Sequence, residues 1–167
     1  MKKRKAKAFS YEVSSWLNAR TRFKKKLTWT NEHRLAANGR DFVDVAGRFE
    51  SAKLPTILVE VELHREDPVS NVVKIWKWAS DNKTGDVLFF HAFSNLYARN
   101  KAERKHRAVF LGRMMKRETD IEYIPLTLKY SPRPGGVFGA GRRTKAAKLL
   151  ARRIMEHLLR SRPGFFR

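Results

Sequence analysis

Three carboxylates are spaced so that they could hold a metal ion. Glu60 and Glu62 stand two residues apart in the apolar run over residues 56–63. This run is rich in β-branched and aliphatic residues and predicts a strand, in which both carboxylates lie on one face. Because buried like charges are costly unless something binds them, the pair indicates a cation. Asp44, in the preceding run over residues 41–49, is the third carboxylate, and such oxygens bind Mg²⁺ or Mn²⁺.

The elements around these acids predict an α/β fold with a mixed central sheet flanked by helices. Apolar periodicity, Asp67-Pro68 as a helix start and Asn38-Gly39 as a hairpin turn define the order of the elements. Residues 1–9 are expected to form a basic flexible arm, and residues 10–167 a single domain containing a Pro/Gly loop over 131–141. We expect helices over residues 11–24, 67–82, 101–117 and 142–160, and strands over residues 27–35, 41–49, 56–63, 87–93 and 121–130.

The charge of the chain predicts a polyanionic partner. Lys and Arg number 37 against 16 Asp and Glu, a formal net charge of +21, and the excess is spread along the whole length. Nucleic acid is favoured because counterion release drives such binding. The apolar fraction of 42% indicates a folded protein with a core. The last predicted helix is amphipathic and strongly basic, and its candidate nucleic-acid-binding residues are Arg142, Arg143, Lys145, Lys148, Arg152 and Arg153.

Several classes of protein are disfavoured by composition. The chain has no cysteine, which excludes disulfides and thiolate metal sites. No apolar run approaches the roughly 20 residues that span a bilayer, and the basic N-terminus lacks the apolar segment of a secretory signal. We therefore expect a cytoplasmic protein without a membrane partner. The five histidines are scattered, and His91, within an apolar run, is expected to be a core histidine with satisfied hydrogen bonds.

The order of the elements and acids resembles the PD-(D/E)XK, or restriction-endonuclease-like, nuclease superfamily. The matching residues are Asp44 in FVDVAGRF and the Glu60-Val61-Glu62 segment in LVEVEL, set in an αβββαβ order over residues 10–93. The resemblance implies a Mg²⁺-dependent endonuclease that acts on duplex or branched DNA, with a homodimer possible. The family usually has lysine where Glu62 stands. Some restriction enzymes with this pattern carry a second glutamate there, and in other members the lysine has moved to the following helix.

Each residue of the candidate site has an expected role and an alternative. Asp44 and Glu60 are expected to bind the metal, with the Val61 carbonyl completing the coordination, and Glu62 to orient water or act as a general base. The alternative is that the acids pair with arginines. Lys74, in the following helix, is the candidate for the displaced catalytic lysine; alternatively, it is a solvated residue opposite the apolar stripe.

The predicted function is hydrolysis of DNA phosphodiester bonds. The same basic surface also fits a protein that binds DNA or structural RNA without catalysis. The two functions differ in whether Asp44, Glu60 and Glu62 converge in the fold.

Overall fold

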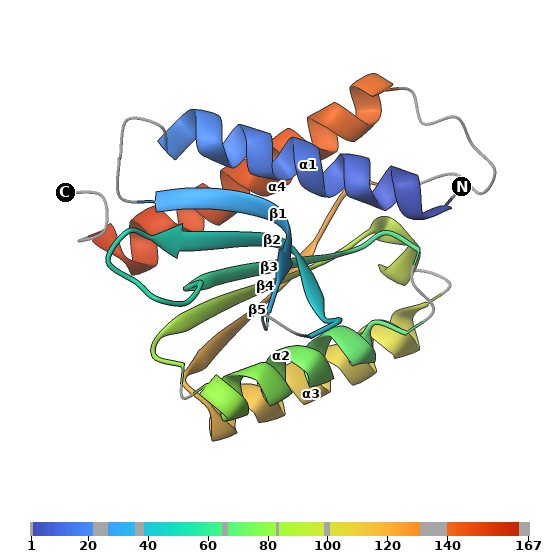
Figure 1. The fold of residues 1–167 in the computed structure, drawn as a ribbon. Coiled ribbons are helices and arrows are strands. Elements are labelled where there is room, and N and C mark those ends of the chain that lie inside the picture. The colour runs from blue at the N-terminus through green and yellow to red at the C-terminus, as the bar shows by residue number, and fades with distance from the viewer. Residues whose placement is uncertain are drawn as a thin grey trace.

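The computed structural model describes residues 2–21, 27–35, 39–64, 67–82, 84–98, 101–130 and 140–163. Within these residues the chain forms a five-stranded mixed sheet between two pairs of helices (Figure 1). None of the described helices has the length and apolar character needed to cross a membrane. In chain order the elements are α1 (Lys2–Thr21), β1 (Leu27–Arg34), β2 (Phe42–Phe49), β3 (Ile57–Glu62), α2 (Val69–Asn82), β4 (Val87–Phe93), the 3₁₀ helix η1 (Asn95–Ala98), α3 (Ala102–Glu118), β5 (Ile121–Thr127) and α4 (Ala140–Ser161).

The strands lie in the order in which they occur in the chain, β1-β2-β3-β4-β5. β1, β2 and β3 pair in antiparallel fashion, whereas β3, β4 and β5 are parallel. The carboxyl ends of β3, β4 and β5 therefore meet at one end of the sheet, together with the amino end of β2. This end also receives the start of α2, which follows β3 after a short connection.

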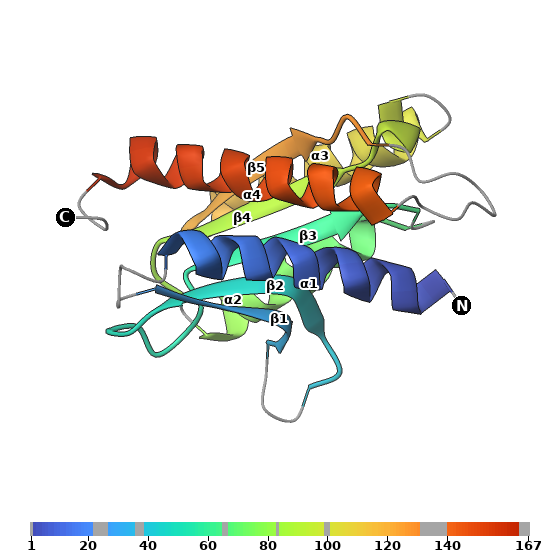
Figure 2. The same cartoon turned by 90° about the horizontal axis from the view of Figure 1, so that it is seen from above.

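The two faces of the sheet are covered by different helices. α1 and α4 run side by side over one face, and α2 and α3 cover the other (Figures 1 and 2). The α1/α4 side buries Val13, Leu17, Leu150 and Ile154 against the sheet, and the α2/α3 side buries Val72, Ile75 and Met115. All seven residues of β4 are buried, as its continuous apolar run predicts for a strand covered on both faces.

The predicted order of elements is confirmed, with one helix start corrected. α1 begins at Lys2, whereas the sequence pattern predicts a helix start near residue 11 and a flexible arm over residues 1–9. Phe9 is fully buried, so the apolar face of the helix extends further toward the N-terminus than expected. The predicted loop over residues 131–141 and the turn residue Asn38 lie outside the described residues, except that residues 140 and 141 belong to α4.

The inner face of α2 differs from the predicted one. The apolar pattern of this helix places Trp78 off the inner stripe, where it could stack on a base or pack against the C-terminal half; in the structure only 4% of Trp78 is exposed. Trp76, expected within the stripe, is only partly buried. The helix is rotated so that positions seven residues apart, Asn71 and Trp78, also turn inward. Its buried residues are Asn71, Val72, Ile75, Trp78 and Ala79.

Candidate active site

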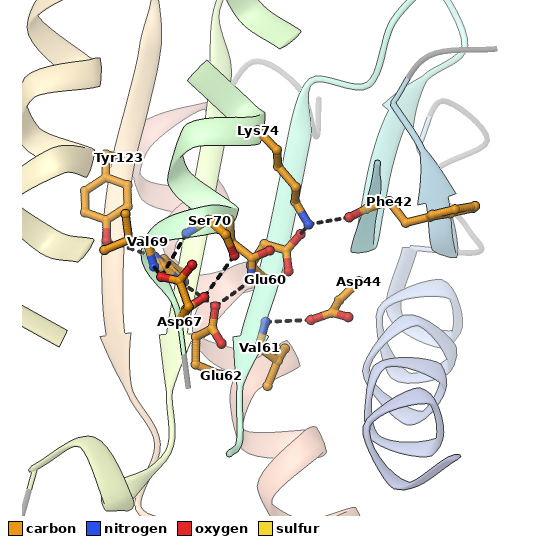
Figure 3. Close-up of polar contacts among 12 residues, drawn as sticks. Phe42, Asp44, Glu60, Val61, Glu62, Asp67, Val69, Ser70, Lys74 and Tyr123 are labelled. Atoms are coloured by element: carbon orange, nitrogen blue, oxygen red, sulfur yellow. Dashed lines mark hydrogen bonds and ion pairs between the residues drawn. The ribbon is translucent and has the colours of Figure 1, made fainter. Parts of the chain in front are cut away.

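The site begins where Asp44 reaches across from β2 to β3. The β2–β3 ladder pairs Gly47 with Ile57 and ends with Val45 opposite Val59. Asp44 is the next residue toward the amino end of β2. Its carboxylate oxygen Oδ2 accepts a hydrogen bond of 2.8 Å from the backbone N–H of Val61. The Asp44 side chain thus points toward β3 and is half-buried (Figure 3).

Glu60 lies beside Asp44 and is almost completely buried, with a side chain only 2% exposed. Burial raises the pKa of Glu60 well above its usual value of 4.5, and the negative charge of Asp44 raises this pKa further, while Lys74 opposes the shift. The two carboxylates are therefore close enough to repel each other electrostatically. Asp44 and Glu60 thus lie close together, and their expected role as metal ligands stays a prediction.

Lys74 enters the site from α2. Its Nζ lies 2.6 Å from Glu60 Oε1, and it also donates a hydrogen bond to the backbone carbonyl of Phe42 (Figure 3). The Lys74 side chain is only 14% exposed. Its interpretation as a solvated residue on the helix face is therefore wrong, whereas its catalytic role stays a prediction. Lys77, by contrast, remains exposed and pairs with Asp81 one helical turn away.

The start of α2 fixes the approach of Lys74. Asp67 Oδ1 accepts hydrogen bonds from the backbone N–H groups of Val69 at 3.1 Å and Ser70 at 3.4 Å. This is the N-cap that the Asp67-Pro68 pair predicts, and it satisfies N–H groups that have no partner within the helix. α2 follows β3 and packs back on the sheet. Lys74, one helical turn beyond Ser70, therefore reaches Glu60.

Glu62 shares the face of Glu60, as the strand period predicts, but it belongs to a separate buried network. Its Oε1 accepts a 2.5 Å hydrogen bond from Asn71 Nδ2 and lies 3.0 Å from His91 Nε2. His91 Nδ1 lies 3.0 Å from the hydroxyl of Tyr123. A neutral imidazole in this position donates from Nε2 to Glu62 and accepts at Nδ1 from Tyr123. The prediction that His91 is a core histidine with satisfied hydrogen bonds is confirmed.

The network holds Glu62 in one orientation. Burial, and next the charge of Glu62, raise the pKa of Tyr123, so its hydroxyl stays protonated and able to donate. α2, β4 and β5 each supply one member, namely Asn71, His91 and Tyr123. The expected role of Glu62 in orienting water or acting as a base stays a prediction.

The residues present are compatible with a divalent cation. No group of three His, Cys, Asp or Glu side chains in the described part of the chain is arranged to hold a metal ion. Asp44 and Glu60 offer two carboxylates, and Mg²⁺ commonly binds through one or two carboxylates together with water and substrate phosphates. Burial, and next the charge of Asp44, raise the pKa of Glu60, and a cation bound to both carboxylates would offset these two effects.

The basic residues predicted on α4 do not gather around Glu60, because α4 covers the opposite face of the sheet from α2 (Figure 1). Arg143 forms an ion pair with Glu12 of α1, and Arg152 pairs with Glu156 one turn along α4. Arg142 and Lys145 are exposed, Lys148 lies 4.7 Å from the centre of the Trp16 ring, and Arg153 donates to the Thr127 carbonyl.

Sequence reasoning missed two members of the buried network, Asn71 and Tyr123. A polar residue beside the apolar stripe of α2 is a weak signal for Asn71, since such residues commonly face solvent. Tyr123 lies 61 residues beyond Glu62 in the chain, and only the pairing of β5 with β4 brings it to His91. A comparison with protein-family models finds no match, and a comparison with curated proteins finds no significant one.

Proposed function

We propose that this protein is a metal-dependent endonuclease that hydrolyses phosphodiester bonds in DNA. The observation that supports it is the meeting of Asp44, Glu60 and Lys74 at the end of the sheet where β2 and β3 part. Two carboxylates and an ammonium at one point provide oxygen ligands for a cation and a positive charge for a phosphate. The net charge of +21 provides long-range attraction for the polyanion.

Each residue has a defined part in the proposed reaction. A divalent ion bound there would neutralise charge developing on the phosphate and lower the pKa of a water molecule. Asp44 and Glu60 would hold it through their carboxylate oxygens, with the Val61 carbonyl as a further ligand. Lys74, already 2.6 Å from Glu60, would place its ammonium against the phosphate oxygens or the attacking water, where the negative charge increases in the transition state.

The resemblance to the PD-(D/E)XK nucleases supports the same proposal. The chain has the order α1, β1, β2, β3, α2, β4, with the acid on β2, a glutamate on β3 and the lysine on the next helix. We infer that Lys74 replaces the lysine that the family usually places two residues after the glutamate. Glu62 occupies that position here, and its contacts with Asn71 and His91 suit a buried positioning role.

Nicking of a supercoiled plasmid, with and without Mg²⁺, tests the proposal. The parent is expected to cut only with the metal, and Asp44→Asn and Glu60→Gln are expected to lose cleavage while retaining DNA binding. Asp81→Asn is the matched control, because Asp81 is an exposed acid that pairs with Lys77. Metal-independent cutting, or full cutting by either site variant, would contradict the proposal.

A second candidate function is binding of nucleic acid without catalysis, favoured by the large positive charge alone. In that case the ion pair between Lys74 and Glu60 would be structural. Parent protein that binds DNA but cuts no duplex, branched or single-stranded DNA under any divalent metal would support this function instead.

A further inference from the structure

We propose that Lys105 and Arg153 together bind one backbone phosphate of duplex DNA, at the carboxyl end of β5. The proposal rests on the proposed function only in taking DNA as the ligand. It concerns a second site, separate from Asp44, Glu60 and Lys74, that would fix the course of the DNA across the end of the sheet.

The two cations approach the same residue from opposite faces of the sheet. Lys105, on α3, donates a hydrogen bond of 2.7 Å from Nζ to the Thr127 hydroxyl. Arg153, on α4, donates one of 2.8 Å from its NH1 nitrogen to the Thr127 backbone carbonyl. Thr127 is the last residue of β5, an edge strand, and is exposed. Both positive groups thus bind the same exposed residue at the end of β5.

Neither cation is neutralised by an acid in the part of the chain that the structure describes. The partners of Lys105 are the Thr127 hydroxyl and the face of the Phe93 ring, 5.7 Å from the ring centre. The acceptor of Arg153 is a carbonyl. Other basic residues of the same helices do have carboxylate partners, as in the pairs Arg107–Glu103 and Arg152–Glu156.

Two like charges anchored on one residue, with no acid among the described residues pairing with either, favour an anion that contacts both. Each keeps further N–H donors beyond the one used at Thr127, since an ammonium has three and a guanidinium five. Both side chains are half-buried, which lowers the entropy lost when they bind a ligand. Arginine and lysine are the usual partners of phosphate oxygens, and a phosphodiester is the anion that the charge of this protein predicts.

The second site lies on the same end of the sheet as the candidate active site. The β3–β4 register places Glu62 beside Phe93, and the β4–β5 register places Phe93 beside Thr127. Thr127 is therefore level with Glu62 and two strands away, roughly 10 Å at the usual strand spacing. A duplex carries phosphates along its whole length, so DNA lying across this end could contact both sites at once.

The test measures the salt dependence of binding to a labelled DNA duplex, with a chelator present to prevent cleavage. The Lys105→Gln/Arg153→Gln double variant is compared with Lys77→Gln/Arg107→Gln, which removes the same charge from exposed residues that pair with acids. The slope of log K against log salt is negative, and the loss of one phosphate contact is expected to reduce its magnitude by about 0.9 relative to this control. Because both cations bind one phosphate, each single variant should reduce this magnitude by less than the double variant does.

Three results would overturn the inference. The first is a double variant whose slope equals that of the control, and the second is a pair of single variants that each reduce the magnitude of the slope by about one, with the two reductions adding in the double variant. The third is a parent that does not bind DNA. Thermal melting of every variant shows whether the fold is retained. A slope loss in the double variant, together with a parent that never cleaves, would leave the phosphate site standing and reject the nuclease. Cleavage by the parent, together with a double variant whose slope equals that of the control, would support the nuclease and reject the phosphate site.

Discussion

Replacing Lys74 by methionine removes the charge at the candidate site and keeps most of the side-chain volume. In the parent, Lys74 Nζ lies 2.6 Å from Glu60 Oε1 and donates to the Phe42 carbonyl, with only 14% of the side chain exposed. The variant leaves a buried carboxylate beside Asp44 without its cation, and it leaves a carbonyl without this donor. Lys77→Met is the matched control, on the same helix but exposed.

The size of the effect on stability follows from this burial. Exposed ion pairs contribute about 0–1 kcal/mol, whereas breaking a buried pair costs about 3–5 kcal/mol. Glu60 can take up a proton in the variant, which limits the loss, so we expect the free energy of unfolding to fall by about 2 kcal/mol near neutral pH. Because protonated Glu60 needs no cation, this loss should shrink as the pH falls toward the usual Glu60 pKa of 4.5.

The effect on catalysis is measured by single-turnover cleavage with metal in excess. Loss of a positioned electrostatic group commonly lowers the rate by about 10²-fold or more, and we expect this for Lys74→Met, with Lys77→Met close to the parent. Urea denaturation across the acidic to neutral pH range gives the stability of each variant. A Lys74→Met variant that cuts as fast as Lys77→Met would refute the role of Lys74 and leave Glu62 as the candidate for activating water.

Two further predictions concern packing and charge near the site. Gly112→Ala should destabilise the protein by about 1–3 kcal/mol in urea denaturation, because a Cβ on this helical residue would lie 2.3 Å from the Tyr123 ring; unchanged or increased stability would show that the ring moves aside freely. Glu60→Gln should gain stability relative to the parent as the pH rises above 4.5, because the raised pKa means that folding opposes ionisation of Glu60; a difference independent of pH would contradict this.

The sequence predicted the acids of the site better than their partners. Glu60 and Glu62 share a face because the period of a strand is two, and this follows from their spacing alone. The two glutamates nevertheless have different environments, one beside Lys74 and the other bound by Asn71 and His91. These contacts depend on how α2 and β4 pack on β3, which no local pattern determines.

The helices show the same division between local and long-range information. The N-cap at Asp67 was predictable from two adjacent residues, and the structure confirms it. The rotation of α2 that buries Trp78 was not, since the apolar stripe predicted for this helix includes Trp76 and leaves Trp78 outside it. The convergence of Lys105 and Arg153 required the pairing of β5 with β4 and the placing of α3 and α4 on opposite faces.

The central claim is that Asp44 and Glu60 hold a divalent cation. Calorimetric titration of Mn²⁺ into the protein without DNA measures this directly, in the parent and in Glu60→Gln, with Asp81→Asn as the control acid. We predict saturable binding by the parent and the control, and its loss in Glu60→Gln. Equal binding by the parent and Glu60→Gln, or none by the parent even with DNA present, would contradict the claim.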